Sequence, residues 1–193
     1  MKGQPHGVVI RNLAGYPDSG FDRGRATYVR VLWLAVWGMV GVRWWCPNRA
    51  RLAILRLFGA RFGQGCIVRP RVRIDLPWKL VVGDHSWIGE AVWIINPETV
   101  TIGSNVCLSQ QAVVCSGSHD ACSPVFARNS RPVRIDDGAW IALRGTVLSG
   151  VRVGSGATVG AGAVASRDIA PGTFVRQETA PTENIAQESE GWK

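Results

Sequence analysis

The feature that most constrains this chain is a pattern that repeats every six residues across residues 82–164. An aliphatic residue opens each block, a glycine often follows it, and a small residue or a valine usually stands four places later. The opening residues are Val82, Ile88, Ile102, Leu108, Val114, Ile135, Ile141, Val147, Val153 and Val159. Helices repeat every ~3.6 residues and strands every ~2, so this longer period indicates a structural repeat.

Three such blocks make one turn of a triangular coil, with a short strand on each side and a tight bend at each corner. The opening aliphatic residues point inward and stack on their equivalents in neighbouring coils, and this apolar row is buried only when several coils stack. Glycine permits corner conformations that a Cβ would penalise. A β-sandwich is the alternative, but its strands alternate with period two and its loops vary in length. The pattern therefore predicts a mainly β solenoid.

The coils are expected to begin at residues 62, 82, 102, 135 and 153. Two-residue insertions near Trp78 and Asn96 lengthen the first two coils, and residues 120–134 leave the coils as one long loop. A long loop in a regular structure is typical of a functional element. We therefore divide the chain into an N-terminal arm with two helices (1–61), the solenoid (62–175) and a polar C-terminal tail (176–193).

The N-terminal region combines positive charge with an apolar segment. Its first 75 residues hold thirteen Lys and Arg against three Asp and Glu, in a chain of net charge +8. Residues 27–45 are predicted to form a helix that packs on the solenoid or on a partner subunit, or that lies at a membrane surface. The uncharged run at 31–42 is shorter than the roughly twenty residues that span a bilayer.

A second helix is predicted at residues 49–58, with Leu52, Leu55 and Phe58 buried and Gly59 as its C-terminal stop. Its wet side is expected to carry three arginines, Arg49, Arg51 and Arg56. No nucleic-acid recognition motif accompanies these arginines, and a basic face alone is poor evidence for one. We therefore expect no nucleic-acid partner.

The composition favours a single-domain cytoplasmic protein. A length of 193 residues suits one domain with a sizeable core. The five cysteines form no C-x-x-C pair, which argues against a disulfide framework or metal finger. The first 28 residues lack the apolar core of a signal peptide. We expect a cytoplasmic location, with association at the inner face of the membrane if the first helix lies there.

Five segments of the chain match a known family: residues 77–90 (PWKLVVGDHSWIGE), 100–103 (VTIG), 118–120 (SHD), 137–141 (DGAWI) and 160–164 (GAGAV). With these segments the chain resembles the hexapeptide-repeat acyltransferases, most of all the polysaccharide O-acetyltransferases of the colanic acid biosynthesis type. The resemblance implies a left-handed parallel β-helix with a short N-terminal helical segment, assembled as a homotrimer. It also implies transfer of an acetyl group from acetyl-CoA, without a metal, to a sugar hydroxyl in polysaccharide or glycoconjugate biosynthesis.

Acetyl transfer to an alcohol requires a general base, and histidine is the side chain that titrates near neutral pH. Three histidines are present. His6 lies in the arm and is expected to be incidental, and His85 is expected at the surface of a coil. His119 ends the third coil where the loop leaves, and its position matches the base of similar acetyltransferases. Asp120 either orients the imidazole or caps the loop.

The resemblance places five residues at the acetyl-CoA site: Trp140, Ala142, Gly160, Ser166 and Arg167. Trp140 is either a wall of the groove between subunits or a packing aromatic. Relatives usually carry Gly where this chain has Ala142, and Lys where it has Arg167. They also read Gly-Asn-Pro-Ala-Lys where this chain has residues 176–180 (RQETA), so the segment that helps hold the cofactor differs.

Other functions remain open from the sequence. A γ-type carbonic anhydrase shares the fold but needs three histidines around zinc, and only two lie in the coils. A degenerate solenoid that acts as a scaffold would explain the altered C-terminal segment. An acetyltransferase with a small non-sugar acceptor is a further alternative. Trp78, Trp87 and Trp93 are expected along one face of the coils, as a surface for subunit packing or as a platform on which a sugar stacks.

Overall fold

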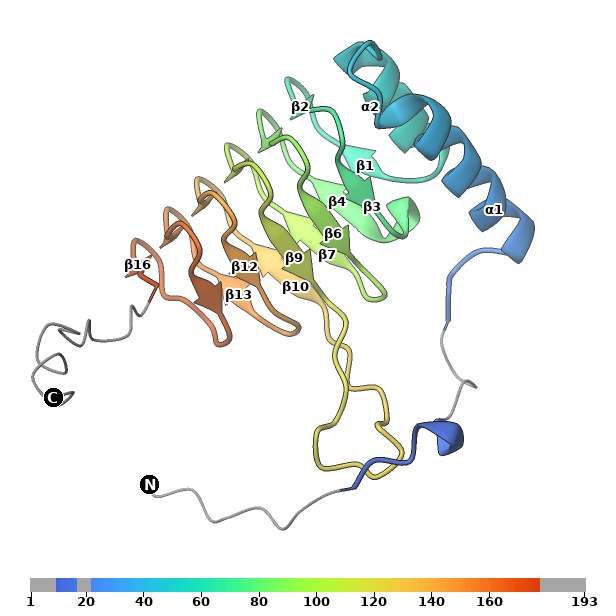
Figure 1. Cartoon of the computed structure of the whole chain (residues 1–193). Helices are drawn as coiled ribbons and strands as arrows, with labels where there is room; N and C mark the ends of the chain where they lie inside the picture. The colour runs from blue at the N-terminus through green and yellow to red at the C-terminus, as the bar shows by residue number, and fades with distance from the viewer. Residues whose placement is uncertain (1–9, 17–21, 178–193) are drawn as a thin grey trace, which may run out of the picture.

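The computed structural model describes residues 10–16 and 22–177. It is a parallel β-solenoid with a helical segment near its N-terminus, so the predicted fold class is confirmed (Figure 1). Its helices are η1 (Leu13–Gly15), α1 (Thr27–Val36), the π-helical turn η2 (Trp37–Gly41), α2 (Asn48–Leu57) and η3 (Pro77–Lys79). The two predicted helices correspond to α1 with η2, and to α2.

Three parallel sheets form the sides of the coils. The first sheet contains β1 (Arg61–Phe62), β4 (Leu80–Val82), β7 (Val100–Ile102), β10 (Val133–Ile135) and β13 (Arg152–Val153). The second contains β2 (Ile67–Val68), β5 (Trp87–Ile88), β8 (Cys107–Leu108), β11 (Trp140–Ile141), β14 (Thr158–Val159) and β16 (Phe174–Val175). The third contains β3 (Arg73–Ile74), β6 (Trp93–Ile95), β9 (Val113–Cys115), β12 (Thr146–Val147) and β15 (Val164–Ala165).

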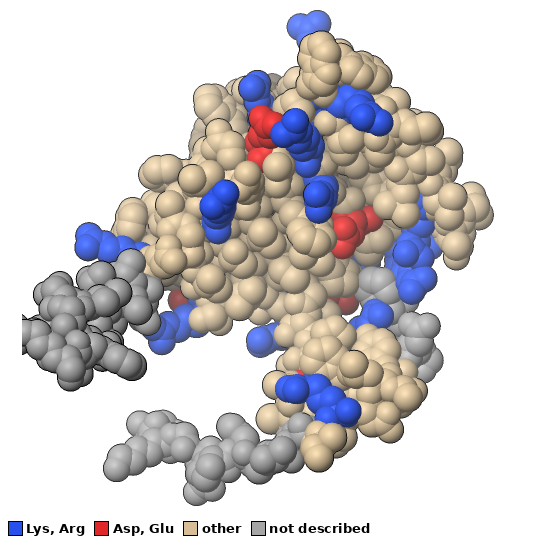
Figure 2. Space-filling view, in the orientation of Figure 1, with Lys and Arg blue, Asp and Glu red and all other residues tan. Residues whose placement is uncertain are grey.

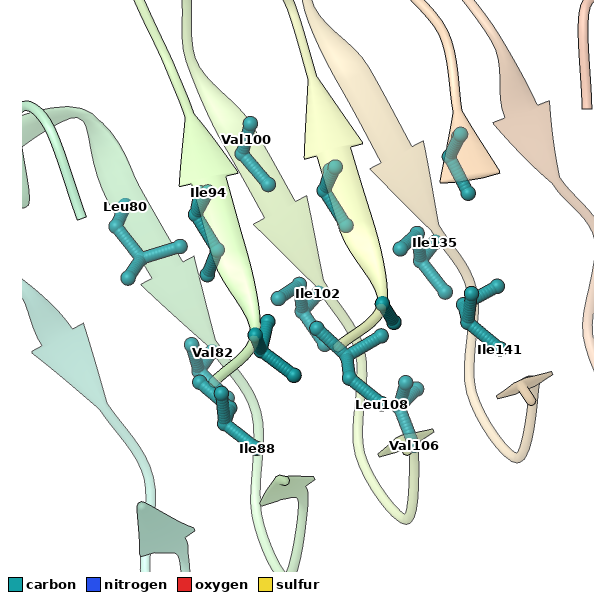
Figure 3. Close-up of a cluster of buried hydrophobic side chains, with 14 of the residues drawn as sticks. Leu80, Val82, Ile88, Ile94, Val100, Ile102, Val106, Leu108, Ile135 and Ile141 are labelled. Atoms are coloured by element: carbon teal, nitrogen blue, oxygen red, sulfur yellow. The ribbon is translucent and has the colours of Figure 1, made fainter. Parts of the chain in front are cut away.

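The register along the first sheet confirms the predicted coil starts. Phe62 pairs with Val82, Val82 with Ile102, Ile102 with Ile135, and Ile135 with Val153. The aliphatic residues that open the blocks are buried in one continuous core, and Figure 3 shows them stacked inside the coils. Apolar burial of this kind is the main favourable term in folding, so the repeated aliphatic row specifies the solenoid.

The corners need small residues because successive coils approach closely there. A Cβ built on Gly83 would lie 2.6 Å from the backbone of Gly103, and one on Gly103 would lie 2.2 Å from Asp137 Oδ1. Both distances are shorter than van der Waals contact, so glycine is required at these two positions. His85 lies at the same corner as Gly83, with a φ of 54°, and is exposed, as expected for a surface residue.

Side chains of the helices meet the free edge of the first coil. The unpaired backbone groups of an edge strand invite association with other chains unless something covers them. Here Asn48 Nδ2 donates to the Cys66 carbonyl at 2.9 Å, and its Oδ1 accepts from Val68 N–H at 2.8 Å. The indole N–H groups of Trp33 and Trp37 donate to the carbonyls of Ile74 (3.0 Å) and Val72 (2.9 Å).

Asn48, Trp33 and Trp37 thus form a side-chain cap on the first coil, and Arg51 belongs to it. The prediction that Arg51 lies on the solvent-exposed side of α2 was wrong. Its side chain is 4% exposed and donates to the carbonyls of Gly41 (2.9 Å) and Val68 (3.3 Å), and also to that of Arg43. Burial lowers the pKa of its guanidinium below the ordinary value. These carbonyls have few other hydrogen-bond donors. Their hydrogen bonds with Arg51 offset the free-energy cost of burying its charge.

Helix α1 and the turn η2 have two different faces. Trp33 and Trp37 are buried, with ring centroids 4.9 Å apart, so one face packs on the solenoid as predicted. The other face exposes Tyr28, Val31, Leu32, Leu34 and Met39, and Trp44 and Trp45 follow it. In the described part of the chain, no helix combines the length and apolar character needed to cross a bilayer.

The tryptophans predicted along one face lie in three places, so that prediction was wrong. Trp78 belongs to η3 and donates to the Arg23 carbonyl at 2.7 Å. Trp87 lies on the second sheet and Trp93 on the third. The register instead aligns Trp87 with Trp140 on the second sheet, separated by Cys107. These two side chains are 56% and 47% exposed, as outward-facing residues should be.

The long loop leaves the corner between the third and first sheets. It occupies residues 116–132, between β9 and β10, and Arg134 belongs to β10 although we expected it in the loop. An antiparallel bridge between His119 and Arg128 closes the base of the loop. In Figure 1 the loop projects from the middle of the solenoid and η1 lies beside its tip, where Asn12 N–H donates to the Pro124 carbonyl at 2.8 Å.

Candidate functional site

A cavity of about 530 Å³ lies where the loop, α1 and the corners of the early coils meet. Its floor comes from the corners and includes Leu76, Ile95 and Pro97. Asn96 joins two of these corners, because its side chain exchanges hydrogen bonds with both backbone groups of Leu76 (2.9 and 2.7 Å). The walls come from α1, from the loop and from Tyr16. Cavities of this size commonly bind small molecules.

His119 lines this cavity from the loop side. Its ring stacks on Phe126 with centroids 4.2 Å apart and an angle of 6° between the planes, and Tyr16 lies 5.7 Å away. His119 Nδ1 is 2.9 Å from the Phe126 carbonyl oxygen. A carbonyl can only accept, so Nδ1 carries the proton and the neutral ring keeps its lone pair on Nε2. In the neutral ring, Nε2 is thus the nitrogen that can accept a proton or a hydrogen bond.

Phe126 holds this contact in an unusual backbone conformation. Its φ is 52°, a region that non-glycine residues rarely adopt and that typically costs about 1–3 kcal/mol. Its N–H donates to the Ser123 carbonyl at 2.9 Å. Such conformations persist where the surroundings impose them and gather at functional sites. The loop therefore maintains a strained residue at the point where the histidine is oriented.

Asp120 lies next to the histidine but makes its contacts within the loop. Its Oδ1 accepts from Cys122 N–H at 2.9 Å, and its carbonyl accepts from Ser123 N–H at 3.2 Å. These contacts correspond to the second of the two expected roles, capping of the loop. The group in contact with His119 Nδ1 is the Phe126 carbonyl, which the sequence did not single out.

Three charged side chains complete the cavity: Arg30 from α1, Asp75 from a corner and Arg128 from the loop. Arg128 Nε donates to the Tyr16 hydroxyl, which ties the N-terminal segment to the loop. Desolvation by the surrounding walls raises the pKa of Asp75, although a hydrogen bond from Trp93 Nε1 (3.5 Å) acts in the opposite direction. Asp75 is nevertheless exposed to solvent.

The other histidines do not join this cavity. His85 lies at a corner between the first and second sheets, whereas His119 lies at the corner between the third and first. His6 is outside the described residues. Across residues 10–16 and 22–177, no three His, Cys, Asp or Glu side chains gather as metal ligands would.

The structure brings together three of the residues expected at the cofactor site. Trp140 lies on β11 and donates from Nε1 to Ser109 Oγ at 2.8 Å. Ala142 follows β11 and Gly160 follows β14, and Ile141 pairs with Val159, so the two small residues are neighbours at one corner. Ala142 is buried and its N–H donates to the Val159 carbonyl at 2.8 Å.

Ser166 and Arg167 lie elsewhere, at the corner between the third and first sheets, beside a hollow of about 600 Å³ at the last coil. This corner is on the same edge as the loop, two coils further along. None of the five expected cofactor residues lines the His119 cavity. One chain therefore places the candidate base and the candidate cofactor residues at separate positions.

Sequence reasoning missed several residues of the cavity. Tyr16 lies in the N-terminal arm, and no pattern in the sequence links it to the loop. No motif in the sequence marks Arg30 or Asp75. Each reaches the cavity through contacts between segments far apart in the chain, which periodicity does not encode.

The fold defines a class, a solenoid built from hexapeptide repeats, and solved structures share it. An acetyltransferase of Vibrio cholerae O1 biovar eltor (VCA0836), in complex with acetyl coenzyme A, superposes with a TM-score of 0.71 at 22% identity, covering 81% of this chain and 87% of that one. Galactoside acetyltransferase in complex with coenzyme A superposes with a TM-score of 0.71 at 20% identity, covering 83% and 82%. No family model matches the sequence.

Sequence comparison gives the family. The chain is 38% identical over 156 residues to WcaF of Escherichia coli (strain K12), which is named as a colanic acid biosynthesis acetyltransferase. The alignment covers 79% of this chain and 84% of that relative. The chain therefore belongs to the hexapeptide-repeat acetyltransferases, as its motifs predicted.

Proposed function

We propose that this enzyme transfers an acetyl group from acetyl-CoA to a hydroxyl of a carbohydrate acceptor, with His119 as the general base. The observation that carries the proposal is the Nδ1 contact with the Phe126 carbonyl, which makes Nε2 the accepting nitrogen of the neutral ring, in a residue that lines a cavity of suitable size. Two further findings support it. The relative WcaF is named for colanic acid biosynthesis, and two proteins of the same fold are described with acetyl-CoA or CoA.

The chemistry follows from the tautomer. His119 Nε2 takes the proton of the acceptor hydroxyl as its oxygen attacks the thioester carbonyl, and a new C–O bond forms. The C–S bond then breaks, and the protonated imidazole returns the proton to the departing thiolate. The Phe126 carbonyl stabilises the imidazolium in the interval, because Nδ1–H donates to it throughout. In this scheme Asp120 keeps the loop in shape, since its carboxylate is directed to Cys122 N–H.

A homotrimer is part of the proposal, because one chain keeps His119 apart from Trp140, Ala142 and Gly160. A second copy packed along the loop-bearing edge would bring its own coils to the cavity. The second sheet exposes an aromatic row suited to such packing, and an apolar row of this kind is rarely left in water. Its members are Trp87, Trp140 and Phe174. Light scattering should give three times the 20.9 kDa chain mass, and a monomer would exclude a shared site.

We also propose a peripheral membrane contact through the exposed face of α1 and η2, whose apolar side chains stand among N-terminal arginines. Figure 2 shows that Lys and Arg outnumber Asp and Glu on one face of the molecule. Apolar and basic groups together favour anionic lipid surfaces. Flotation with anionic liposomes should weaken as salt is added, and should be lost when Leu32 and Trp44 are both changed to Ser.

The decisive experiment replaces the base. His119→Ala should lower the rate of CoA release in the presence of a sugar acceptor by about 10² to 10⁴, the usual range for a positioned base. Its melting temperature should stay close to that of the wild type because the side chain is exposed. His85→Ala is the matched control and should have little effect. A folded His119→Ala enzyme with near-full turnover would exclude His119 as the base, and a wild-type protein without transferase activity would favour the scaffold.

A further inference from the structure

The cavity contains a positive charge that the proposed reaction does not use. Arg30 lines it from α1 and is half-buried. Considering all residues that the structure describes, its guanidinium forms neither an ion pair nor a side-chain hydrogen bond. Removing a guanidinium from water costs free energy unless an acceptor compensates it. Arg30 is therefore placed to receive an acceptor that is not part of the described chain.

The other charges of the cavity leave it net positive. Arg128 adds a second guanidinium from the loop, and Asp75 is the one carboxylate among the lining residues. Asp75 lies beyond ion-pair distance of Arg30, and its hydrogen bond is with Trp93 Nε1. Field lines from two cations converge in such a partly closed space and attract anions.

We propose that the acceptor of this enzyme carries an anionic group, a carboxylate or a phosphate, and that this group binds Arg30 while the hydroxyl to be acetylated lies at His119. The inference rests on the proposed function and adds the chemical class of its acceptor. A guanidinium matches both oxyanions, because its planar array of N–H groups makes paired hydrogen bonds to two oxygens.

The positions of the two residues suit a single sugar bound between them. Arg30 comes from α1, His119 comes from the loop, and the floor between these walls is largely apolar, with Leu76, Ile95 and Pro97. A sugar ring offers an apolar C–H face to such a floor while its substituents reach the walls. The charge then selects the acceptor and fixes which of its hydroxyls faces Nε2.

The test uses one neutral and two anionic sugar derivatives. Methyl β-glucoside is neutral, methyl β-glucuronide carries a carboxylate on the same ring, and glucose 1-phosphate carries a phosphate. Wild-type kcat/KM should favour at least one of the anionic acceptors by about 10- to 100-fold, as expected for a charge-assisted hydrogen bond. A larger preference for the glucuronide indicates an acidic sugar, and a larger preference for the phosphate indicates a phosphorylated acceptor.

Arg30→Gln should reduce that preference to near one while it leaves kcat/KM for methyl β-glucoside within a few-fold. Arg30→Lys should restore part of the preference because it keeps the charge without the planar donor array. Arg49→Gln is the matched control, since Arg49 is exposed on α2 and does not line the cavity. It should behave as the wild type.

Calorimetric binding of the same three ligands provides a readout that does not depend on turnover. Tighter binding of an anionic ligand that is lost in Arg30→Gln supports an anion-binding site at Arg30 even if acetyl transfer fails, in which case the proposed function alone is wrong. Equal affinity and equal kcat/KM for neutral and anionic ligands would overturn it. An Arg30→Gln variant that loses activity equally with all three acceptors would also overturn it, because that result indicates a structural role.

Discussion

The coils and the cavity end of the molecule are built in opposite ways. In the coils one unit recurs, and equivalent positions such as Val82, Ile102 and Ile135 make the same contacts with their neighbours above and below. The cavity is assembled from segments that each occur once: η1 with Tyr16, helix α1, the early corners and the loop. Redundant contacts carry stability, whereas the departures from the repeat carry the candidate chemistry. The comparison therefore predicts that substitutions in the two regions will affect different measurements.

The largest expected effect on stability comes from the core of a coil. Ile102 is 1% exposed, and Ile102→Ala should lower the free energy of unfolding by about 2–5 kcal/mol, because it removes buried methyl groups and leaves a cavity. Urea denaturation measures the loss. Thr101→Ala, one residue earlier with its side chain outward, should cost under about 0.5 kcal/mol. Turnover per folded molecule should be unchanged in both, and a large loss of kcat in Ile102→Ala would show that the two regions are not separable.

A smaller effect is expected at the boundary between the regions, where Arg51 meets the carbonyls of the first coil. Arg51→Ala leaves buried acceptors without donors, so unfolding should become easier by about 2–3 kcal/mol. Arg49→Ala, on the exposed side of the same helix, should change stability by less than about 0.5 kcal/mol. Similar values for the two variants would mean that water replaces the guanidinium and that the cap contributes little.

The smallest effect concerns Asp136, a buried carboxylate paired with two largely exposed arginines. Asp136 accepts from Arg134 Nε (2.6 Å) and Arg152 Nε (2.7 Å). Burial acts to raise the pKa of Asp136, but these hydrogen bonds outweigh it and hold that pKa below its ordinary value. A lowered pKa in the folded state stabilises the protein above the unfolded pKa of about 3.9, and this contribution is lost as the pH falls through the folded value.

Asp136→Asn should therefore reduce stability at pH 7 by about 1 kcal/mol or less, since both arginines are largely exposed to solvent. The difference from the wild type should shrink as the pH is lowered through the range in which Asp136 takes up its proton. Urea unfolding at a series of pH values measures this. A difference that stays constant with pH would show that the carboxylate acts through packing and not through its charge.

The sequence predicted the coils well and the cavity end poorly. The coil starts at residues 82, 102, 135 and 153 were predicted correctly because each aliphatic residue is selected by its immediate neighbours in the stack. Gly59 takes a φ of 98° after α2, as a helix stop should. The coil starts and the helix stop follow from the repeat and from residue type, and both are visible in the sequence alone.

The errors concern side chains whose surroundings come from elsewhere in the chain. Arg51 was predicted on the solvent-exposed side of α2 because charged side chains usually lie there. It is buried instead, because it donates hydrogen bonds to the carbonyls of Gly41 and Val68. Trp78 was aligned with Trp87 and Trp93 by sequence spacing, although the two-residue insertion places it on a corner. His119 was singled out from the sequence as the candidate base, but its contact with the Phe126 carbonyl becomes visible only in the folded loop, because a backbone carbonyl leaves no trace in composition.

The side-chain cap on the first coil has a consequence for the order in which this protein is made. Asn48, Arg51, Trp33 and Trp37 bind carbonyl groups of residues 66–74, which leave the ribosome shortly after the helices do. The helices and the first coil can therefore settle while most of the chain is still being synthesised, because domains form from the N-terminus during translation. Each later coil then adds to an edge that is already complete. Pulsed hydrogen exchange during refolding should detect protection at residues 66–74 before residues 146–165. The solenoid is thus expected to grow in one direction, the direction of translation.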